Sequence, residues 1–243
     1  GEVDAARREA AAAGLVGESA DPEVIWTLAW LYDRAGAPDV GHAFARGRLV
    51  DYRSHWPAGR WRLAWEIAYP RAWDSVVVRE CDAAHIAPPL TWAVMREESA
   101  FDPEAHSPAS AFGLMQLIPK TARLVARGTD LPFDEQELLK PDVSIALGTR
   151  LLATLRTSFP SHPALAIAAY NSGAGAVRRW LASYGADAFD LFVEHIGFDE
   201  TRAYVKRVLA SEAAYAYLYA PAALAQIFAV PAQIDARDVV SGR

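Results

Sequence analysis

The chain has 243 residues, of which 52% are hydrophobic and 22% charged, and its formal net charge is −6. This length is enough to bury the core of one large domain or two, while charges recur too often for any apolar stretch to cross a bilayer. The acidic balance argues against nucleic acid as the main partner. The single cysteine, Cys81, excludes an intrachain disulfide and is expected to be a small buried side chain.

Helical signals fill the first third of the sequence. Residues 4–13 are rich in Ala and charge, and a second helix begins at Asp21-Pro22 and closes at Gly36. A third helix is expected over about residues 39–53. Helices joined by such short turns form αα-hairpins, the unit of helical solenoids, although the sequence shows no clear repeat.

An aromatic segment follows. It contains Trp56, Trp61, Trp65 and Trp73. One interpretation is a carbohydrate-stacking surface, and the alternative is packing between the first helices and the next domain. The mixed spacing of four, five and eight residues favours packing. We place the domain boundary at the linker-like segment 69–71.

The remainder of the chain is also expected to be helical, which makes the fold class all-α. The residues predicted as a turn are 171–175, where glycines permit positive φ, and residues 221–243 are expected to be a tail packed over the domain or partly loose. The predicted helices are about 72–85, one ending near Phe101, one starting at Pro119, Pro141–Phe159, Pro163–Tyr170 and Glu200–Tyr219.

Glu98 has an unusual predicted setting. Leu90, Val94 and Glu98 are four residues apart, and Met95 is three before Glu98, so the carboxyl group emerges from the apolar side of a helix, nearly opposite Arg96. A desolvated carboxyl group has a raised pKa and suits general acid catalysis. The alternative is an ordinary solvated Glu near a helix C-terminus.

Three motifs, taken together, resemble the soluble lytic murein transglycosylase family. The first comprises Glu98-Ser99, Ser107-Pro108, Gly113-Leu114-Met115-Gln116, Pro119 and Thr121-Ala122. The second is A-Y-N-S-G-A-G at 169–175, and the third is E-T-R-A-Y-V at 200–205. The resemblance covers roughly residues 79–219. It implies a lysozyme-like catalytic domain over 74–222, preceded at 1–73 by helices similar to the family's superhelical region and followed by a tail at 223–243.

The resemblance also implies a reaction, in which the β-1,4 bond between N-acetylmuramic acid and N-acetylglucosamine of peptidoglycan is cut without water. Glu98 would act as the single acid and base, with a 1,6-anhydromuramic acid product. Two alternatives remain open: a hydrolytic muramidase similar to goose-type lysozyme, and a non-catalytic muropeptide-binding or scaffold protein.

The family pattern implies a set of substrate-binding residues. For two of them another role competes: Tyr170 as a core tyrosine, and Glu200 as a favourable acid at a helix start. Departures from the pattern at Ile118, Ser110 and Lys120 are expected to reshape the walls of the site. The implied residues are Ser107, Met115, Gln116, Ile118, Tyr170, Asn171, Glu200 and Tyr204.

No cofactor is implied, and His85 and His106 lack neighbouring ligands at zinc spacing, so no metal site is expected. The implied partners are peptidoglycan glycan strands, with complexes for cell-wall synthesis or secretion left unspecified. The substrate places the protein in the periplasm or cell envelope, although no signal peptide is visible in the sequence.

Overall fold

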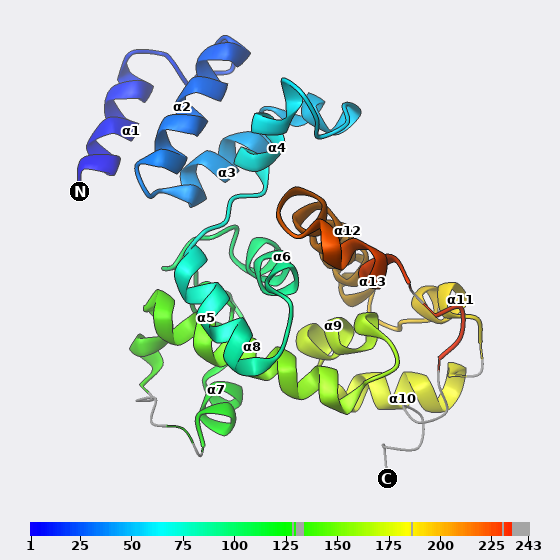
Figure 1. The fold of residues 1–243 in the computed structure, drawn as a ribbon. Coiled ribbons are helices and arrows are strands. Elements are labelled where there is room, and N and C mark those ends of the chain that lie inside the picture. The colour runs from blue at the N-terminus through cyan, green and yellow to red at the C-terminus, as the bar shows by residue number, and fades with distance from the viewer. Residues whose placement is uncertain (128, 130–133, 186, 230, 235–243) are drawn as a thin grey trace. The chain divides into compact units, whose positions relative to one another are not determined.

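The computed structural model describes residues 1–127, 129, 134–185, 187–229 and 231–234, drawn as a coloured ribbon in Figure 1. Within these residues every regular element is a helix, and paired extended residues occur only as isolated bridges. The all-α prediction is therefore confirmed. The chain divides into two compact units, residues 1–72 with 100–102, and residues 73–99 with 103 onward.

Proline opens many of the longer helices. Its φ is already near the helical value, and its missing N–H is one that the first turn of a helix leaves without an intrahelical acceptor. The helices that begin in this way are α2 (Pro22–Arg34), α3 (Pro38–Gly47), α6 (Pro88–Glu98), α7 (Pro119–Ala126), α8 (Pro141–Ser158) and α9 (Pro163–Ser172).

The first unit contains α1 (Glu2–Ala12), the antiparallel pair α2 and α3, the 3-10 helix η1 (Val50–Ser54) and α4 (Trp61–Ala68). Helices α2 and α3 pack together, and α4 packs against both. The core between them includes the fully buried ring of Tyr52. Trp65 packs inside this unit, with ring centroids 5.2 Å from Tyr52 and 5.4 Å from Tyr69.

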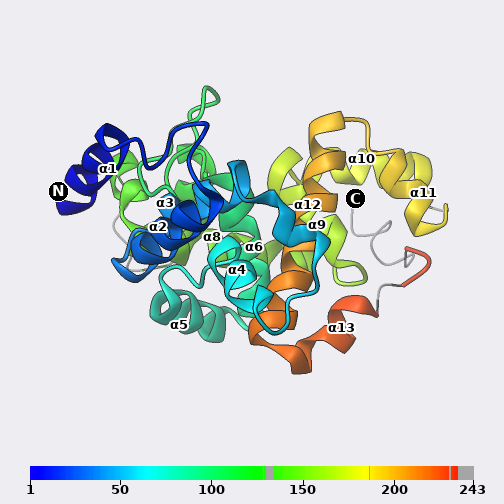
Figure 2. The same cartoon turned by 90° about the horizontal axis from the view of Figure 1, so that it is seen from above.

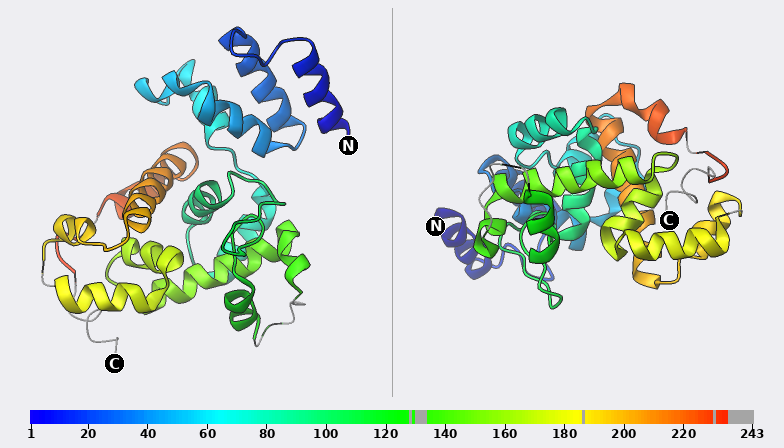
Figure 3. Two further views of the ribbon diagram at one scale, coloured as in Figure 1. Left: turned by 180° about the vertical axis from the view of Figure 1, so that it is seen from behind. Right: turned by 90° about the horizontal axis from the view of Figure 1, so that it is seen from below.

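The second unit is organised around α8, the long light-green helix that crosses the middle of this unit in both views of Figure 3. It packs against α5, α7 and α9 and also contacts α6. The elements not yet given are α5 (Asp74–Ala84), η2 (Glu135–Leu139), α10 (Ala174–Tyr184), α11 (Phe189–Glu194), α12 (Asp199–Tyr219), η3 (Pro221–Ala223) and α13 (Leu224–Phe228).

Helices α6, α9 and α12 bring three distant parts of the sequence together. Helix α12 packs along α6 and also contacts α9, as the views in Figures 1 and 2 show. The C-terminal ends of α6 and α9 and the N-terminal part of α12 contribute to one groove, described below. Cys81, in α5, is fully buried with Sγ 3.2 Å from Oγ1 of Thr91, which confirms its prediction as a small core residue.

Several helix boundaries differ from the predictions. Helix α6 ends at Glu98 rather than near Phe101, because Ala100 and Phe101 have φ of +51° and +68°, which an α-helix excludes. The third helix ends at Gly47, and the chain continues as the tighter turn of η1 instead of an α-helix to residue 53.

The predicted turn over residues 171–175 is shorter in the structure. Helix α9 includes Asn171 and Ser172, and the break falls at Gly173, whose φ of +81° suits glycine. Helix α10 begins at the next residue, and neither α10 nor α11 was predicted. In the predicted tail, residues 224–228 form α13, while residues 235–243 lie outside the described residues. None of the described helices is both long and apolar enough to span a bilayer.

Candidate active site

Glu98 is the last residue of α6, and its neighbours on the apolar side are buried: Leu90 is 4% exposed, and Val94 and Met95 are fully buried. Burial is the main reason why the pKa of Glu98 is raised to about 7, and the negative charges of Glu200 and Glu97 raise it further. This is the direction that the helical spacing predicts. At neutral pH, Glu98 is therefore divided between its acid and its carboxylate forms.

Tyr204 supplies the hydrogen bond that Glu98 receives. Its hydroxyl donates to Oε1 of Glu98 over 2.6 Å. Tyr204 lies on α12 with 3% of its surface exposed, and burial raises the pKa of its phenol well above the usual value. The phenol therefore remains a donor, and this bond lowers the pKa of Glu98, partly opposing the effect of burial.

Glu98 opens into a groove of about 720 Å³ that lies entirely within the second unit. Its walls come from the end of α6, the loop before α7, the end of α9 and the first turns of α12. Seven of the eight predicted substrate-binding residues line this groove. They are Ser107, Gln116, Ile118, Tyr170, Asn171, Glu200 and Tyr204.

Met115 is the exception. It is fully buried and does not line the groove, so the prediction that it contacts substrate does not fit the structure. Its side chain packs where Gly148 has no Cβ, since a Cβ there would lie 2.6 Å from Met115 atoms. Its backbone is fixed on both sides: the N–H donates to Oγ of Ser144 (3.1 Å), and the carbonyl accepts from the hydroxyl of Tyr170 (2.7 Å). Met115 therefore holds the groove wall in place through its buried side chain and its backbone hydrogen bonds.

The loop that carries Met115 is held by internal hydrogen bonds. The side-chain amide of Gln116 donates to the carbonyls of Ala105 and Gly113, both at 3.0 Å. Gln116 itself has a φ of +44°, which is uncommon outside glycine and occurs preferentially at functional sites. Ser110, where the family pattern has glycine, also lies at positive φ, +57°. The loop is thus a specific conformation that its own polar groups stabilise.

The second and third motifs are linked by a side-chain hydrogen bond. The hydroxyl of Thr201 donates to Oδ1 of Asn171 over 2.6 Å, which ties the start of α12 to the end of α9. Tyr170, next to Asn171, uses its hydroxyl on the Met115 carbonyl. Tyr170 therefore combines the two roles considered from sequence: it lines the groove, and its hydroxyl is satisfied by the backbone. Glu200 is exposed at the groove and lies in the first turn of α12.

A charged network beside Glu98 was not predicted. The side chain of Glu97 is only 1% exposed and pairs with Arg96 (2.5 Å) and Arg207 (3.1 Å). Ser211 also donates to Glu97, over 3.1 Å. Arg207 and Thr201 line the groove as well. Helical spacing is the sequence signal that could have placed Arg207 at the groove. Residue 207 is three after Tyr204 and therefore lies on the same side of a helix.

In the part of the chain that the structure describes, no group of three or more His, Cys, Asp or Glu side chains is arranged to hold a metal ion. The groove offers two desolvated carboxyl groups, of which Glu97 is paired with arginines and Glu98 is not, together with two phenols and several amide and hydroxyl groups. An all-α domain with one desolvated glutamate that has no arginine partner, at the end of a helix, fits the lysozyme-like fold that the sequence resemblance implies.

Comparison with known proteins finds a matching family. Residues 76–193, just under half of the chain, match the transglycosylase SLT domain family. The soluble lytic murein transglycosylase of Escherichia coli K12 is 38% identical over 155 residues, which cover 63% of this chain and 24% of the relative. The present chain thus spans about a quarter of that relative's length.

Two solved structures are similar to the chain. The 70-kDa soluble lytic transglycosylase of Escherichia coli matches with a TM-score of 0.73 and 32% identity, over 82% of this chain and 31% of that one. An inactive mutant of the lytic transglycosylase Slt from Pseudomonas aeruginosa matches with a TM-score of 0.72 and 31% identity, over 98% and 35%. Both confirm the helical, lysozyme-like fold, and both matches cover more of the chain than the second unit alone, so they extend into the first unit.

Proposed function

We propose that this chain is a peptidoglycan lytic transglycosylase that cleaves the β-1,4 bond between N-acetylmuramic acid and N-acetylglucosamine. The observation that carries the proposal is the Glu98 carboxyl group, whose pKa is raised to about 7 inside the groove. We place the catalytic domain at 74–222 and the superhelix-like helices at 1–73. The substrate class also places the protein in the cell envelope.

In the first step Glu98 donates its proton to the leaving glycosidic oxygen. A pKa near 7 leaves enough of the acid form at neutral pH and makes the proton easy to transfer. The bond then breaks, and positive charge develops on the muramic acid ring. The carboxylate that remains keeps the hydrogen bond from Tyr204, which stabilises it as it forms. The 2-acetamido group of the sugar stabilises the ring cation.

In the second step the same carboxylate removes the proton from the C6 hydroxyl of the muramic acid. The C6 oxygen attacks the anomeric carbon and closes the 1,6-anhydro ring, and Glu98 regains its proton. This nucleophile belongs to the same sugar and has a high effective concentration, so it competes well with water. An intermediate pKa suits a group that must donate a proton in the first step and accept one in the second.

Of the two other carboxylates at the groove, Glu97 favours this one-residue scheme. Two-carboxylate hydrolysis needs a second acid that is free to act as nucleophile or base. Glu97 is buried in ion pairs with two arginines and accepts a hydrogen bond from Ser211. Glu200 is exposed in the first turn of α12, a position that the helix dipole favours. Its negative charge raises the pKa of Glu98.

A neighbour's ligand offers a binding probe. A 70-kDa soluble lytic transglycosylase that is similar to this chain has been solved as a complex with bulgecin A. We propose that the groove around Glu98 binds the same compound, with displacement by glycan fragments as the readout.

The decisive experiment is mass spectrometry of the products released from purified cell-wall sacculi. Transglycosylation predicts muropeptides with an anhydro end, which are lighter by one water than hydrolysis products. Products with a reducing end would instead show a muramidase. Absence of turnover, with glycan binding retained, would show a non-catalytic muropeptide-binding protein.

A further inference from the structure

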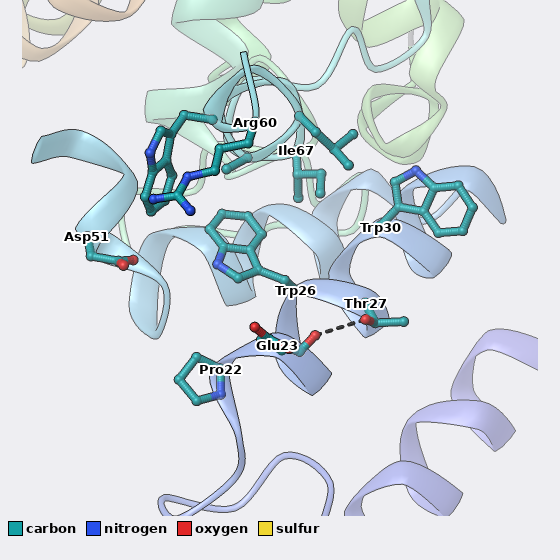
Figure 4. A pocket seen from close by; sticks show the side chains of 11 residues that line it. Pro22, Glu23, Trp26, Thr27, Trp30, Asp51, Arg60 and Ile67 are labelled. Carbon is teal, nitrogen blue, oxygen red and sulfur yellow. Dashed lines mark hydrogen bonds between the residues drawn. The ribbon is translucent and has the colours of Figure 1, made fainter. Parts of the chain in front are cut away.

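The first unit contains a cavity of its own, of about 610 Å³, lined by α2, α4 and the segment around η1 (Figure 4). This volume falls within the range of about 300–1,000 Å³ that is typical of small-molecule sites. Trp26 and Trp30 are one turn apart on α2, and Trp61 begins α4. All three line the cavity, which thereby collects three of the eight tryptophans of the chain.

The aromatic rings of the cavity are held in place by neighbours. Trp26 meets Tyr52 edge to face, at 6.1 Å and 81°. Trp61 stacks on His55, at 3.9 Å and 8°. Trp30, by contrast, remains 39% exposed, and Leu63, which also lines the cavity, is 46% exposed. The cavity therefore presents a pre-positioned apolar surface that the unit does not bury in its own core.

Charged groups surround this surface. The guanidinium of Arg60 lies 5.3 Å from the centroid of the Trp61 ring, and Glu23 and Asp51 line the same cavity. Figure 4 shows Asp51, Arg60 and Glu23 around the central ring of Trp26. Among the residues that the structure describes, none of these three charged side chains forms a hydrogen bond or an ion pair. Their donors and acceptors are available to a ligand.

We infer that this cavity is a second saccharide site, which binds an N-acetylated amino-sugar segment of a glycan strand. Aromatic faces cover the apolar C–H face of a pyranose ring, and the charged groups match its hydroxyl and acetamido groups. A purely apolar ligand or helix would make no use of the charged groups of Glu23, Asp51 and Arg60, which are exposed around the cavity. The choice of sugar rests on the proposed function, whereas the aromatic and charged lining does not.

Two saccharide sites on one chain would increase retention on a polymeric substrate. When one site is engaged, the other meets the same polymer at a raised effective concentration, as long as the strand can reach both. The further site would therefore lower the concentration of sacculi at which turnover saturates, without changing the chemistry at Glu98.

The test uses isothermal titration calorimetry of the full chain with the tetramer of N-acetylglucosamine, in a Glu98→Gln background that prevents turnover. We expect two sites, one in the groove and one in the cavity, of which Trp30→Ala weakens the cavity site by about tenfold or more and leaves the groove site unchanged, as for an aromatic contact residue of the cavity. Trp30→Tyr, which keeps an aromatic face, should restore part of the lost affinity. Trp56→Ala is the matched control, because Trp56 is 69% exposed in the same unit and lies outside the cavity lining.

Several results would overturn the inference. One is that the tetramer does not bind. Another is that Trp30→Ala gives the same isotherms as the parent while circular dichroism shows an intact fold. A dimer that Trp30→Ala dissociates would identify the cavity as a protein interface instead. Turnover of sacculi by the unmodified chain is measured separately. If that turnover fails while binding still depends on Trp30, the proposed function is wrong and the saccharide site stands.

Discussion

Arg207 binds Glu97 and not the adjacent Glu98: its Nε donates to Oε2 of Glu97 over 3.1 Å, while Glu98 receives the hydroxyl of Tyr204. Two consecutive carboxyl groups are thus in opposite surroundings. Glu97 is compensated by two guanidiniums, whereas burial and nearby negative charge raise the pKa of Glu98. Separation of neighbouring acids by their environments is how a protein assigns one of them to proton transfer.

Glu98→Gln should retain the fold and glycan binding but lose nearly all turnover. The amide has the same shape and can neither give nor take the required proton, and the loss of such a group typically costs about a hundred- to ten-thousand-fold in rate. Product release from sacculi measures the effect. Glu212→Gln is the matched control, because Glu212 is also a buried glutamate with a pKa raised to about 7, but it lies outside the groove lining. Wild-type rates for Glu98→Gln would contradict the assignment.

Glu97→Gln should remain active but become less stable. Glu97 has no role in proton transfer, yet its charge compensates Arg96, whose side chain is only 7% exposed. Removing one partner of a buried ion pair leaves the other charge unpaired. Because Gln still accepts hydrogen bonds and Arg207 is 47% exposed, we expect a loss of about 1–3 kcal/mol in the free energy of unfolding. Urea unfolding measures it, and an unchanged midpoint would show that the pair adds nothing to stability.

The pH dependence of activity should report the surroundings of Glu98. With a pKa of about 7, kcat/KM should fall on the alkaline side as the free enzyme loses the proton. Glu200→Gln removes a negative charge that raises this pKa, so the alkaline limb should move to lower pH. Tyr204→Phe removes a hydrogen bond that favours the carboxylate, so the limb should move to higher pH. Shifts of the same sign in both variants would contradict this account.

Much of the groove follows from local sequence. Proline marks the starts of α6, α7, α8 and α9, and the four-residue spacing around Glu98 predicts the desolvation that the structure contains. The end of α6 was harder to predict, because nothing in the residue types Ala100 and Phe101 announces positive φ. These residues belong to the other compact unit, so tertiary context selects their conformation.

The missed features depend on residues far apart in the chain. Glu97 and Arg207 are separated by 110 residues and meet only because α6 packs along α12. Met115 matches a family motif, but its burial depends on the absence of a side chain at Gly148. The tryptophan cavity likewise combines α2 with α4, whereas the aromatic segment predicted from the sequence begins only at Trp56.

Gly113→Ala should disrupt the loop that carries Met115 and Gln116. Gly113 has a φ of +72°, and an added Cβ would lie 1.9 Å from the carbonyl oxygen of Leu138, a backbone atom that cannot move aside cheaply. We expect the unfolding free energy to fall by at least about 3 kcal/mol. We also expect turnover to be lost. Gly14→Ala is the matched control: it has the same φ of +72° with no atom within 4 Å, so it isolates the conformational cost, about 1 kcal/mol. Equal losses in the two variants would exclude the clash as the cause.

Glu212 should make the protein less stable as the pH rises. It lies in α12 with 6% exposure, and burial raises its pKa from 4.5 to about 7, with Arg156 partly opposing the shift. Between these values the unfolded chain loses the proton while the folded chain keeps it. Stability is therefore greatest below about pH 4.5 for this group and declines until about pH 7. The shift corresponds to roughly 3 kcal/mol.

Glu212→Gln removes this titration while preserving the shape of the side chain. We expect the variant to match the wild type near pH 4.5 and to be more stable at pH 8, by up to roughly 3 kcal/mol. The pKa of Glu98 is also raised to about 7, so its ionisation likewise lowers the stability of the folded protein as the pH rises. A weaker decline of stability with pH should therefore persist in the variant. Urea unfolding at a series of pH values, with Glu135→Gln as an exposed control, measures both slopes. Parallel curves for Glu212→Gln and the wild type would show that Glu212 does not titrate differently in the folded and unfolded states.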